Sequence, residues 1–432
     1  MELREVRNQD LHTEQQQIEP AEQWIEPADR GLAAWKLLCT AFVFEALLWG
    51  FPLSFGVFQN YYSKLPEFSE NPYISVVGTI ATGLSYLGAP LVLPMIKLYQ
   101  RYQRQMIWVG WPLCIGGLVV GSFATTLEGL ILSQGVAYGV GFLILYYPIL
   151  NMVNEYWISR RGMAYGLLCG ASGISGTVLP IISEALLERY GYQVTLRAIA
   201  VALVVLTGPL LPLLKGRIPP SEESRIARTD WTFLQSPLFW VYSISNLLQG
   251  LGYFLPALYL PAYATSSGQS SRQGALLLTL MSVSQTAGQF LFGYLSDRNL
   301  PLNPLIAGST AMAAVATLTL WGFASSLPPL IVFVMIYGFF ASSFTAMWAR
   351  MSSAVSGNPT SSDTIFTLFN FGKGIGNVLA GPISAQLISG VGSTASYALQ
   401  KYLGAVVFTG ACMFLSSCTI ALWHLKTVIY VV

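Results

Sequence analysis

Two ionisable residues lie inside long apolar stretches, and they are the first candidates for chemistry in this chain. Glu45 occurs in FVFEALLWG and Lys373 occurs in FNFGKGIGN. A charged side chain at the centre of a bilayer costs at least about 2.5–3.5 kcal/mol, so such a residue usually serves a function. We expect Glu45 to carry a proton, because burial without a counter-ion favours the neutral form of a carboxyl group. The alternative is a paired or protonated carboxyl that only packs.

Lys373 is flanked by Gly372, Gly374 and Gly376, which let the backbone bend and a ligand approach closely. One interpretation is that Lys373 supplies a positive charge to a substrate. The other is that its long stem extends to the cytoplasmic membrane face, where the ammonium group stays in water. A phosphate-binding loop is excluded, because the upstream glycine spacing of such loops is missing.

Polar and aromatic residues in the apolar stretches are further candidates for the wall of a substrate cavity. They are Trp49, Tyr147, Asn151, Gln249, Tyr253, Gln285, Gln289, Asn370 and Asn377. Trp49 follows Glu45 by one helical turn, and its ring can stack on a planar substrate or face lipid. For each amide side chain, the alternative is a hydrogen bond that packs two helices together.

Enzymes and metal proteins are excluded by what the apolar stretches lack. The two histidines, His12 and His424, lie outside these stretches or at the end of one, and the five cysteines have no CxxC spacing. Catalysis within a membrane needs converging nucleophiles and bases, which are missing here. We therefore expect no enzymatic activity, no cofactor and no metal site. A non-transporting membrane sensor or receptor is the alternative of another class, and it would need a signalling domain or a long tail.

The elements that position these residues are twelve apolar stretches. The chain is 53% hydrophobic and 10% charged, whereas a soluble domain carries about 25% charged residues. About 20 apolar residues cross a bilayer as a helix, so the stretches predict an all-α membrane protein. The expected spans are 34–58, 73–95, 104–125, 128–150, 163–187, 193–214, 234–263, 273–295, 304–325, 328–348, 365–389 and 401–425.

A charged segment divides the spans into two sets of six. The expected parts are a disordered cytosolic tail at 1–33, a six-helix half at 34–215, a cytosolic linker at 216–232, a second half at 233–426 and a short cytosolic tail at 427–432. LLCGASGISGTVLPI in the first half resembles NFGKGIGNVLAGPI in the second, which indicates an internal duplication. Most loop arginines and lysines fall on the side of both termini, which predicts that this side is cytosolic.

The most specific stretch of the sequence is YWISRRGMAYGLLCGASGISG, from Tyr156 to Gly176. Arg160 and Arg161 are expected at the cytoplasmic surface, where they can bind anionic groups and fix the helix end. Glycines then recur every three or four residues, and this spacing gives a smooth face on which a neighbouring helix can approach and rock. These glycines are Gly162, Gly166, Gly170, Gly173 and Gly176.

This stretch resembles the fifth-helix signature of the monocarboxylate-porter branch of the major facilitator superfamily. The segment DRGLAAW, from Asp29 to Trp35, is similar to the branch's entry motif, and GFPLSFGVFQNYY, from Gly50 to Tyr62, is similar to its fungal form. GYLSDR, which ends in Asp297 and Arg298, resembles the superfamily's loop motif. The resemblance implies the major facilitator fold, with twelve transmembrane helices in two pseudo-symmetric six-helix halves. It also implies that Asp297 and Arg298, like Arg160 and Arg161, hold one conformational state.

Two departures from the family pattern bear on the substrate. The first-half loop, MIKLYQRYQRQ, lacks the aspartate of the superfamily motif. In the eighth span, Gly288-Gln289 stands where monocarboxylate porters have a Gly-Arg pair implicated in holding the substrate carboxylate. A glutamine cannot provide the fixed charge of bidentate carboxylate recognition, so lactate-like substrates are disfavoured.

The sequence therefore predicts a secondary active transporter that moves a small organic acid or a related metabolite by alternating access, with protons as a coupling partner. Export of a fungal secondary metabolite is the alternative, and the motifs do not separate the two. The expected partners are the substrate, protons and the lipid bilayer, with no nucleic acid. We expect a monomer in the plasma membrane, with the vacuole or another internal membrane as the alternative.

Overall fold

The computed structural model describes residues 27–68, 71–158, 160–217, 230–296, 298, 300–389 and 399–429. Within these ranges the chain forms helices and no β-strand. Helices are the expected solution, because hydrocarbon offers no hydrogen-bond partners and each backbone group must be satisfied within its own segment. Residues 1–26 of the expected tail and most of the linker at 216–232 lie outside the described residues, and α2 already begins at Leu32, inside the bounds expected for the tail.

The first half contains six passes built from short and long helices. They are α2 (Leu32–Tyr62), α3 (Ile74–Leu87) with α4 (Ala89–Leu98), η1 (Gln100–Tyr102), α5 (Gln103–Gly121), α6 (Leu127–Leu130) with η2 (Ile131–Ala137) and α7 (Tyr138–Tyr156), and α8 (Arg161–Thr207) with η3 (Gly208–Leu213). The helices α3 and α4 form one pass that bends by 40° at Gly88.

The second half repeats this arrangement. Its elements are η4 (Trp231–Gln235), α9 (Pro237–Tyr253), α10 (Leu255–Ser266), α11 (Ser271–Ser296), α12 (Leu302–Ala316), η5 (Thr317–Trp321), α13 (Leu327–Ala346), α14 (Trp348–Val355), α15 (Pro359–Ser389), η6 (Gln400–Tyr402) and α16 (Leu403–Ile429). Seven helical segments of the described chain are long and apolar enough to cross a membrane, and the bent pair α3–α4 adds an eighth. The expected spans 104–125, 234–263 and 365–389 fall on α5, on α9 with α10, and on α15.

Two expected spans, 163–187 and 193–214, share the single long helix α8 and its extension. The chain reverses direction at Gly191, whose backbone has φ 75° and ψ 172°. Side chains other than glycine's rarely tolerate this positive φ, so glycine is the residue that fits the reversal. The fifth and sixth passes are therefore joined through one non-helical residue.

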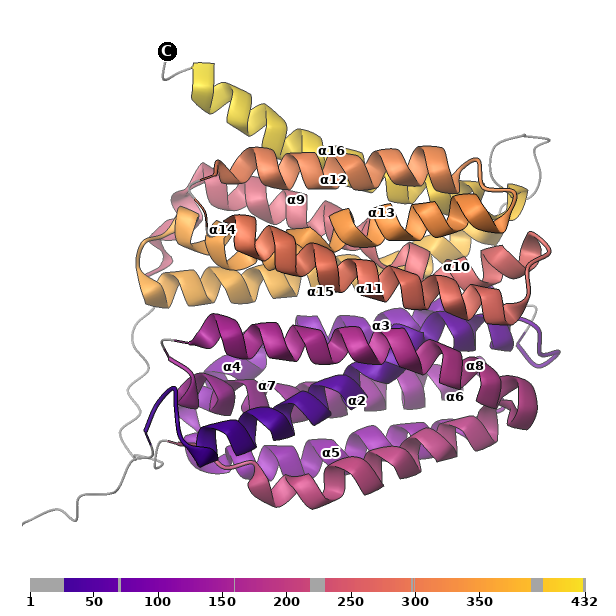
Figure 1. Cartoon of the computed structure of the whole chain (residues 1–432), viewed down its shortest axis with the longest axis horizontal. Coiled ribbons are helices and arrows are strands. Elements are labelled where there is room, and N and C mark those ends of the chain that lie inside the picture. The colour runs from indigo at the N-terminus through magenta and orange to yellow at the C-terminus, as the bar shows by residue number, and fades with distance from the viewer. Residues whose placement is uncertain are drawn as a thin grey trace, which may run out of the picture.

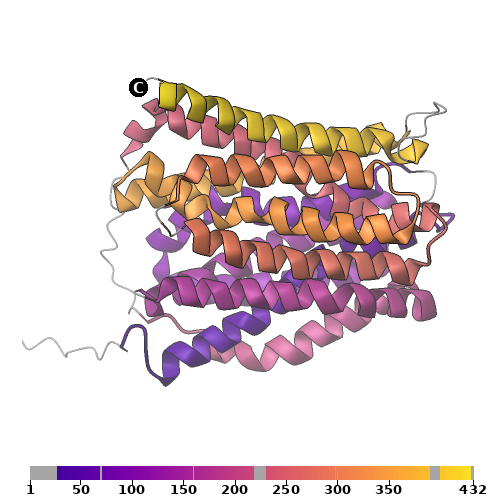
Figure 2. The same ribbon diagram turned by 45° about the horizontal axis from the view of Figure 1, so that its top comes forward.

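The two halves pack side by side with parallel long axes (Figure 1). The helices α8 and α11 form one seam between the halves, and α3 and α15 form the other. The helix α2 begins and α16 ends at the same end of the bundle, as an even number of passes requires. The turned view keeps α8 next to α11 (Figure 2).

A proline inside α2 explains one long-range hydrogen bond of the first half. Pro52 has no N–H, so the carbonyl of Leu48 four residues earlier loses its helical partner. The hydroxyl of Tyr138, at the start of α7, donates to this carbonyl at 2.6 Å. The Leu48 carbonyl therefore keeps a hydrogen-bond partner in a membrane, where an unsatisfied carbonyl costs several kcal/mol.

The second half uses the same device. Pro256 removes the helical donor for the carbonyl of Gly252, at the junction of α9 and α10. The hydroxyl of Tyr337 in α13 lies 3.4 Å from this carbonyl and donates to the carbonyl of Tyr253 at 3.1 Å. A proline in the first pass of each half is thus supported by a tyrosine from the fourth pass. This equivalence agrees with the expected internal duplication.

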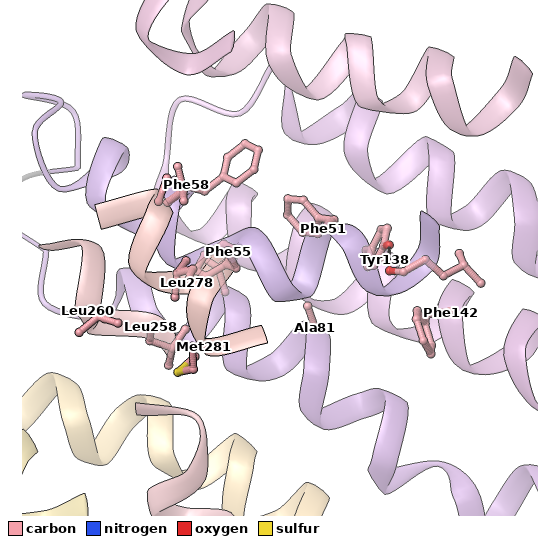
Figure 3. Packing of buried hydrophobic residues seen from close by; sticks show 14 of the residues in the cluster. Phe51, Phe55, Phe58, Ala81, Tyr138, Phe142, Leu258, Leu260, Leu278 and Met281 are labelled. Carbon is pink, nitrogen blue, oxygen red and sulfur yellow. Dashed lines mark hydrogen bonds between the residues drawn. The ribbon is translucent and has the colours of Figure 1, made fainter. Parts of the chain in front are cut away.

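Aromatic side chains dominate the packing around α2 (Figure 3). Phe51, Phe55 and Phe58 lie on one face of the helix, because their spacing of four and three residues matches the helical repeat. The Phe51 ring lies 5.1 Å from Tyr138, measured between ring centroids. Lipid tails are as apolar as these rings, so shape-matched contact rather than escape from water holds the helices together.

Candidate functional site

A cavity of about 1070 Å³ lies between the two halves. Helices α2, α3, α4, α7 and α8 line it from the first half, and α9, α10, α11 and α15 line it from the second. Ligand cavities usually measure about 300–1,000 Å³, so this one is large enough for a drug-sized molecule. The expected residues that line it are Glu45, Trp49, Tyr147, Asn151, Tyr253, Gln285, Gln289 and Asn370.

The cavity reaches the surface at the end of the bundle where α2 begins and α16 ends. The exposed residues Trp231 and Asp363 line it there, together with Gln100 and Arg217. We call this end of the bundle the open end.

The two halves touch at the opposite end, where α2 ends and α11 begins. The ammonium group of Lys64 donates to the hydroxyl of Ser271 at 2.9 Å. The hydroxyl of Thr265 donates to the side-chain oxygen of Asn60, also at 2.9 Å. We call this end the closed end. The cavity is therefore accessible from one side of the bundle.

Glu45 lies in the cavity wall on α2, and its side chain is 6% exposed. The hydroxyl of Tyr146 donates to its carboxyl oxygen at 3.3 Å, and the side chain of Trp49 donates a second hydrogen bond. Glu45 and Trp49 face the same way because they are four residues apart on one helix. Among the described residues, no lysine, arginine or histidine pairs with this carboxyl group.

Aromatic rings surround Glu45 and form the wall that belongs to the first half. The Trp49 ring lies 5.7 Å from Tyr86, 5.0 Å from Phe142 and 6.2 Å from Tyr146, measured between ring centroids. The sequence reasoning selected Tyr147 and missed Tyr146 and Tyr86. Tyr147 lines the cavity, but its hydroxyl is used to bond the Ser85 carbonyl at 2.9 Å. The sequence did contain a signal for Tyr146. It follows Phe142 by one helical turn, so it lies on the helix face that packs against Trp49, whereas Tyr147 does not.

The opposite wall, from the second half, carries amide and hydroxyl groups. Ser282, Gln285, Thr286 and Gln289 line the cavity along one face of α11. Their spacing of three and four residues places them on a single stripe of the helix. The side-chain amides of Gln285 and Gln289 make no hydrogen bond to any other described residue. These two amides are free to bind a ligand.

The open end of the cavity has its own polar network. The side-chain amide of Asn151 donates to Glu155 at 2.8 Å. The second carboxyl oxygen of Glu155 accepts from the backbone N–H of Arg217 at 2.9 Å, and the Arg217 guanidinium donates to the Glu155 carbonyl at 3.2 Å. Asn370, on α15, donates to the Phe366 carbonyl of its own helix at 3.0 Å and also lines the cavity.

Two of the amides expected in the cavity lie elsewhere. Gln249 is fully buried, and its side-chain nitrogen donates to the Ala341 carbonyl at 3.0 Å. Asn377 is also fully buried and donates to the hydroxyl of Thr82 across the seam between α15 and α3. Both residues therefore adopt the packing role that was the alternative interpretation.

The structure places Lys373 in neither of the two expected positions. Its side chain is 1% exposed, does not line the cavity and does not reach the membrane face. Its ammonium nitrogen lies 3.8 Å from the ring centroid of Tyr253, 5.4 Å from Trp348, 5.6 Å from Phe254 and 6.0 Å from Tyr86. Cations are attracted to aromatic faces within about 6 Å, so these rings enclose the charge.

The glycine face of α8 is used over only part of its expected length. A Cβ on Gly173 would lie 2.2 Å from the Thr286 hydroxyl on α11, so glycine is required there for the helices to approach. A Cβ on Gly166 would make an ordinary contact at 3.5 Å with Phe290, and one on Gly170 would meet no atom within 4 Å. The close approach is therefore confined to the part of α8 nearer the closed end.

The remaining residues expected at the gate have local partners. The backbone N–H of Arg160 donates to the Asp29 carboxylate at 2.9 Å, and its side chain is exposed. Arg161 begins α8, and its side chain lies outside the described residues. The guanidinium of Arg298 lies 4.7 Å from the Tyr294 ring centroid and hydrogen-bonds its hydroxyl. Asp297 also lies outside the described residues.

The sequence matches the family model of the Major Facilitator Superfamily over residues 37–270 and 242–426. The chain belongs to the major facilitator superfamily. The match covers both halves and confirms the expected fold of twelve transmembrane helices. As a member of the superfamily, the chain is an integral, multi-pass membrane protein that transports small molecules, and it is not an enzyme.

Relatives within the superfamily include fungal and animal transporters. The chain is 26% identical to the MFS transporter asaE of Aspergillus flavus, over 95% of this chain and 92% of the relative. It is 24% identical to the aspyridones efflux protein apdF of Emericella nidulans, over 88% of this chain and 77% of the relative. It is 26% identical to monocarboxylate transporter 12 of Rattus norvegicus, over 82% of this chain and 78% of the relative. These relatives confirm the resemblance to fungal members of the monocarboxylate-porter type.

The fold is also that of solved structures of the superfamily. The nucleoside transporter NupG superposes on this chain with a TM-score of 0.67 at 13% sequence identity, covering 91% of this chain and 99% of that chain.

Proposed function

We propose that this protein is a secondary active exporter of a bulky organic metabolite, driven by proton entry and working by alternating access. The cavity carries the proposal, because it measures about 1070 Å³ and is walled by aromatic rings and neutral amides. Among the described lining residues, Arg217 is the one cation, and it is bonded to Glu155 at the open end. Such a cavity is too large and too poor in positive charge to suit a short monocarboxylate.

The direction of transport is the finer part of the proposal. One relative is named as an efflux protein for aspyridones, which supports export. Other relatives are named as monocarboxylate transporters, which supports transport of an organic acid as the second candidate. Gln289 lines the cavity at the position expected for the carboxylate-binding arginine. Its neutral amide favours the export candidate.

Alternating access follows from the two ends of the bundle. We take the segments 34–215 and 233–426 as two bodies that rock about the central cavity, with 216–232 as their linker. In the described state the halves touch at the closed end through Lys64 and Ser271. Rocking would separate these contacts and bring the open end together, so the cavity would face the other side of the membrane.

Glu45 is the proposed proton carrier. Its carboxyl group faces the cavity and receives hydrogen bonds from Tyr146 and Trp49, and no described cation neutralises it. An uncompensated charge is costly in a dry cavity, so the protein changes its access more easily when Glu45 is protonated or when a bound substrate donates a hydrogen bond to its carboxylate. Substrate would bind from the open end after Glu45 has released its proton, and a proton would take its place on the opposite side.

The placement in the cell follows from charge. Arg160 directly precedes α8 and Lys426 lies in the last turn of α16, so both belong to the end of the bundle where α2 begins and α16 ends. The positive-inside rule assigns that end to the cytosol, so the open end would collect a cytosolic substrate. We place the protein in the plasma membrane as a monomer, since one chain contains the complete cavity.

Transport in inside-out vesicles containing the full-length chain tests the proposal. With an acidic interior, a proton gradient of one pH unit drives about tenfold accumulation if one proton is exchanged per substrate. We expect this accumulation for bulky aromatic metabolites and not for lactate.

Glu45→Gln should abolish the accumulation and retain exchange of labelled for unlabelled substrate. The control Glu67→Gln, at an exposed carboxylate outside the cavity, should behave as the wild type. Gradient-driven movement of lactate alone, or unchanged accumulation in Glu45→Gln, would overturn the proposal.

A further inference from the structure

The two walls of the cavity differ in chemistry, and together they define a class of substrate. This inference rests on the proposed role of the cavity as the transport site. The wall from the first half is aromatic, with Trp49 at its centre and Tyr86 and Tyr146 on either side. Flat π-faces gain most from a planar ring placed against them or edge-on to them. This wall therefore selects a planar aromatic portion of the substrate.

The wall from the second half selects hydrogen-bonding groups. Gln285 and Gln289 face the cavity one helical turn apart, and neither amide is used by another described residue. Four residues of an α-helix span about 6 Å along its axis. Each amide offers both donors and acceptors, which match another amide, a lactam or a hydroxyl group. This stripe of α11 is therefore suited to a substrate edge that both donates and accepts hydrogen bonds.

The charges around the cavity disfavour an anion. Glu45 projects from the aromatic wall, and its carboxyl group would repel a substrate carboxylate when ionised. Lys373 does not pair with such an anion directly, because its ammonium group is enclosed by rings, and two of these rings, Tyr253 and Phe254, line the cavity while Lys373 does not. Arg217 lies at the open end and is bonded to Glu155. An anion in the centre of the cavity would therefore have no counter-ion among the described residues.

From these observations we infer that the substrate is a neutral aromatic amide or lactam, whose ring system lies against Trp49 while its amide edge bonds Gln285 and Gln289. The carboxyl group of Glu45 remains free to accept a donor from the same edge or to hold its proton. Selectivity against carboxylic acids then arises from Gln289, which supplies hydrogen bonds without charge.

A matched pair of probes tests this inference. The molecules 2-naphthamide and 2-naphthoate share one ring system and differ only in an amide against a carboxylate. Cys169 also lines the cavity, so a bound probe should slow its alkylation by a maleimide. The full-length protein would carry serine at Cys39 and Cys418, the other cysteines that are not buried. We expect 2-naphthamide to protect Cys169 at concentrations at which 2-naphthoate gives no protection.

Variants of the two walls sharpen the test. Gln285→Leu and Gln289→Leu should each raise the half-protecting concentration of 2-naphthamide by about three- to tenfold, the value of one lost hydrogen bond. Trp49→Leu should raise it by a similar factor, and Trp49→Phe should raise it less. Val283→Leu, which is on α11 but points away from the cavity, should leave it unchanged.

The exchange Gln289→Arg gives a result that misfolding cannot imitate. It restores a guanidinium for bidentate carboxylate binding, so 2-naphthoate should gain protection and 2-naphthamide should lose it. Stronger protection of the wild type by 2-naphthoate, or by the cation 2-naphthylmethylammonium, would overturn the inference. An equal effect of Val283→Leu and Gln289→Leu would also overturn it. The assay needs neither transport nor a proton gradient, so its outcome is separable from that of the vesicle experiment.

Discussion

The helices α8 and α11 pack closely near the closed end of the bundle and leave open space between them toward the open end. Near the closed end, a Cβ on Gly173 would lie 2.2 Å from Thr286 of the other half. One turn closer to the open end, a Cβ on Gly170 would meet nothing within 4 Å. Along a single helix face, close packing thus gives way to open space within one turn. We propose that the close-packed part around Gly173 is the pivot of the halves.

The bonds at the two ends also differ in what they connect. At the closed end, Lys64 with Ser271 and Asn60 with Thr265 join one half to the other. At the open end, Glu155 binds Asn151 on its own helix and Arg217 in the segment that follows the first half. Opening the closed end therefore breaks bonds, whereas the bonds at the open end stay intact. This difference suits a protein whose halves separate and rejoin many times.

The largest effect is expected where the closed end has least space. A Cβ on Gly56 of α2 would lie 2.1 Å from the backbone oxygen of Ala257 in α10. Because backbone cannot yield, Gly56→Val should force the closed end apart. Overpacking of this kind costs about 1–3 kcal/mol and shifts a two-state equilibrium by about 5- to 150-fold. The measurement is the alkylation rate of Cys169 by a membrane-impermeant maleimide added on the side of the closed end.

The matched control for this substitution is Gly170→Ala. Its added methyl group would meet open space in the described state, so access to Cys169 should remain as in the wild type. If Gly170→Ala opened the closed end as strongly as Gly56→Val, close packing at the closed end would not be the cause of closure.

An intermediate effect is expected at the open end, and it should affect stability rather than access. Glu155→Gln weakens bonds to Asn151 and to the backbone N–H of Arg217. A hydrogen bond to a charged group contributes about 1.5–3 kcal/mol and one to a neutral group about 0.5–1.5 kcal/mol, so each weakened bond loses about 1 kcal/mol and the purified protein should unfold at a lower temperature. Thermal unfolding and Cys169 alkylation would be measured on the same sample. Faster alkylation from the closed-end side would contradict the view that these bonds stay within one half.

The smallest effect is expected for Lys64→Met. The bond from Lys64 to Ser271 is exposed, and exposed charged contacts contribute about 0–1 kcal/mol. Access of the maleimide from the closed-end side should therefore rise by less than about fivefold. Ser271 also hydrogen-bonds the side chain of Glu184, so Ser271→Ala should have a larger effect than Lys64→Met, and the two effects should not simply add. An effect as large as that of Gly56→Val would make this bond, and not packing, the main lock.

The features of this protein that could be predicted from the sequence are those that depend only on the residues of a single helix. Long apolar runs predicted the passes, and a spacing of four residues puts Glu45 and Trp49, which both line the cavity, on a common helix face. The same reasoning failed for Tyr146 and Tyr147, because neighbouring residues on a helix point in different directions. One sequence does not fix the rotation of a helix about its axis. Only the packed structure shows that Tyr146 bonds Glu45 and Tyr147 bonds Ser85.

Lys373 shows a second limit of sequence reasoning. The rings that enclose it belong to Tyr86 of the first half and to Tyr253, Phe254 and Trp348 of the second, so they come from three different passes. The residues next to Lys373 in the sequence do not predict that aromatic rings surround it. The same holds for Gln249 and Gln285, since both are glutamines in apolar spans and only one faces the cavity. Contacts that depend on the relative placement of distant helices could not be predicted.

The reversal at Gly191 has a mechanical consequence for the pivot. The fifth and sixth passes meet at this one residue, with no flexible loop to absorb movement between them. If the fifth pass tilts along α11, the sixth pass must tilt with it as part of the same rigid body. We propose that motion at the seam between the halves is thereby transmitted to the sixth pass, so that the surrounding lipid resists or assists each transport cycle.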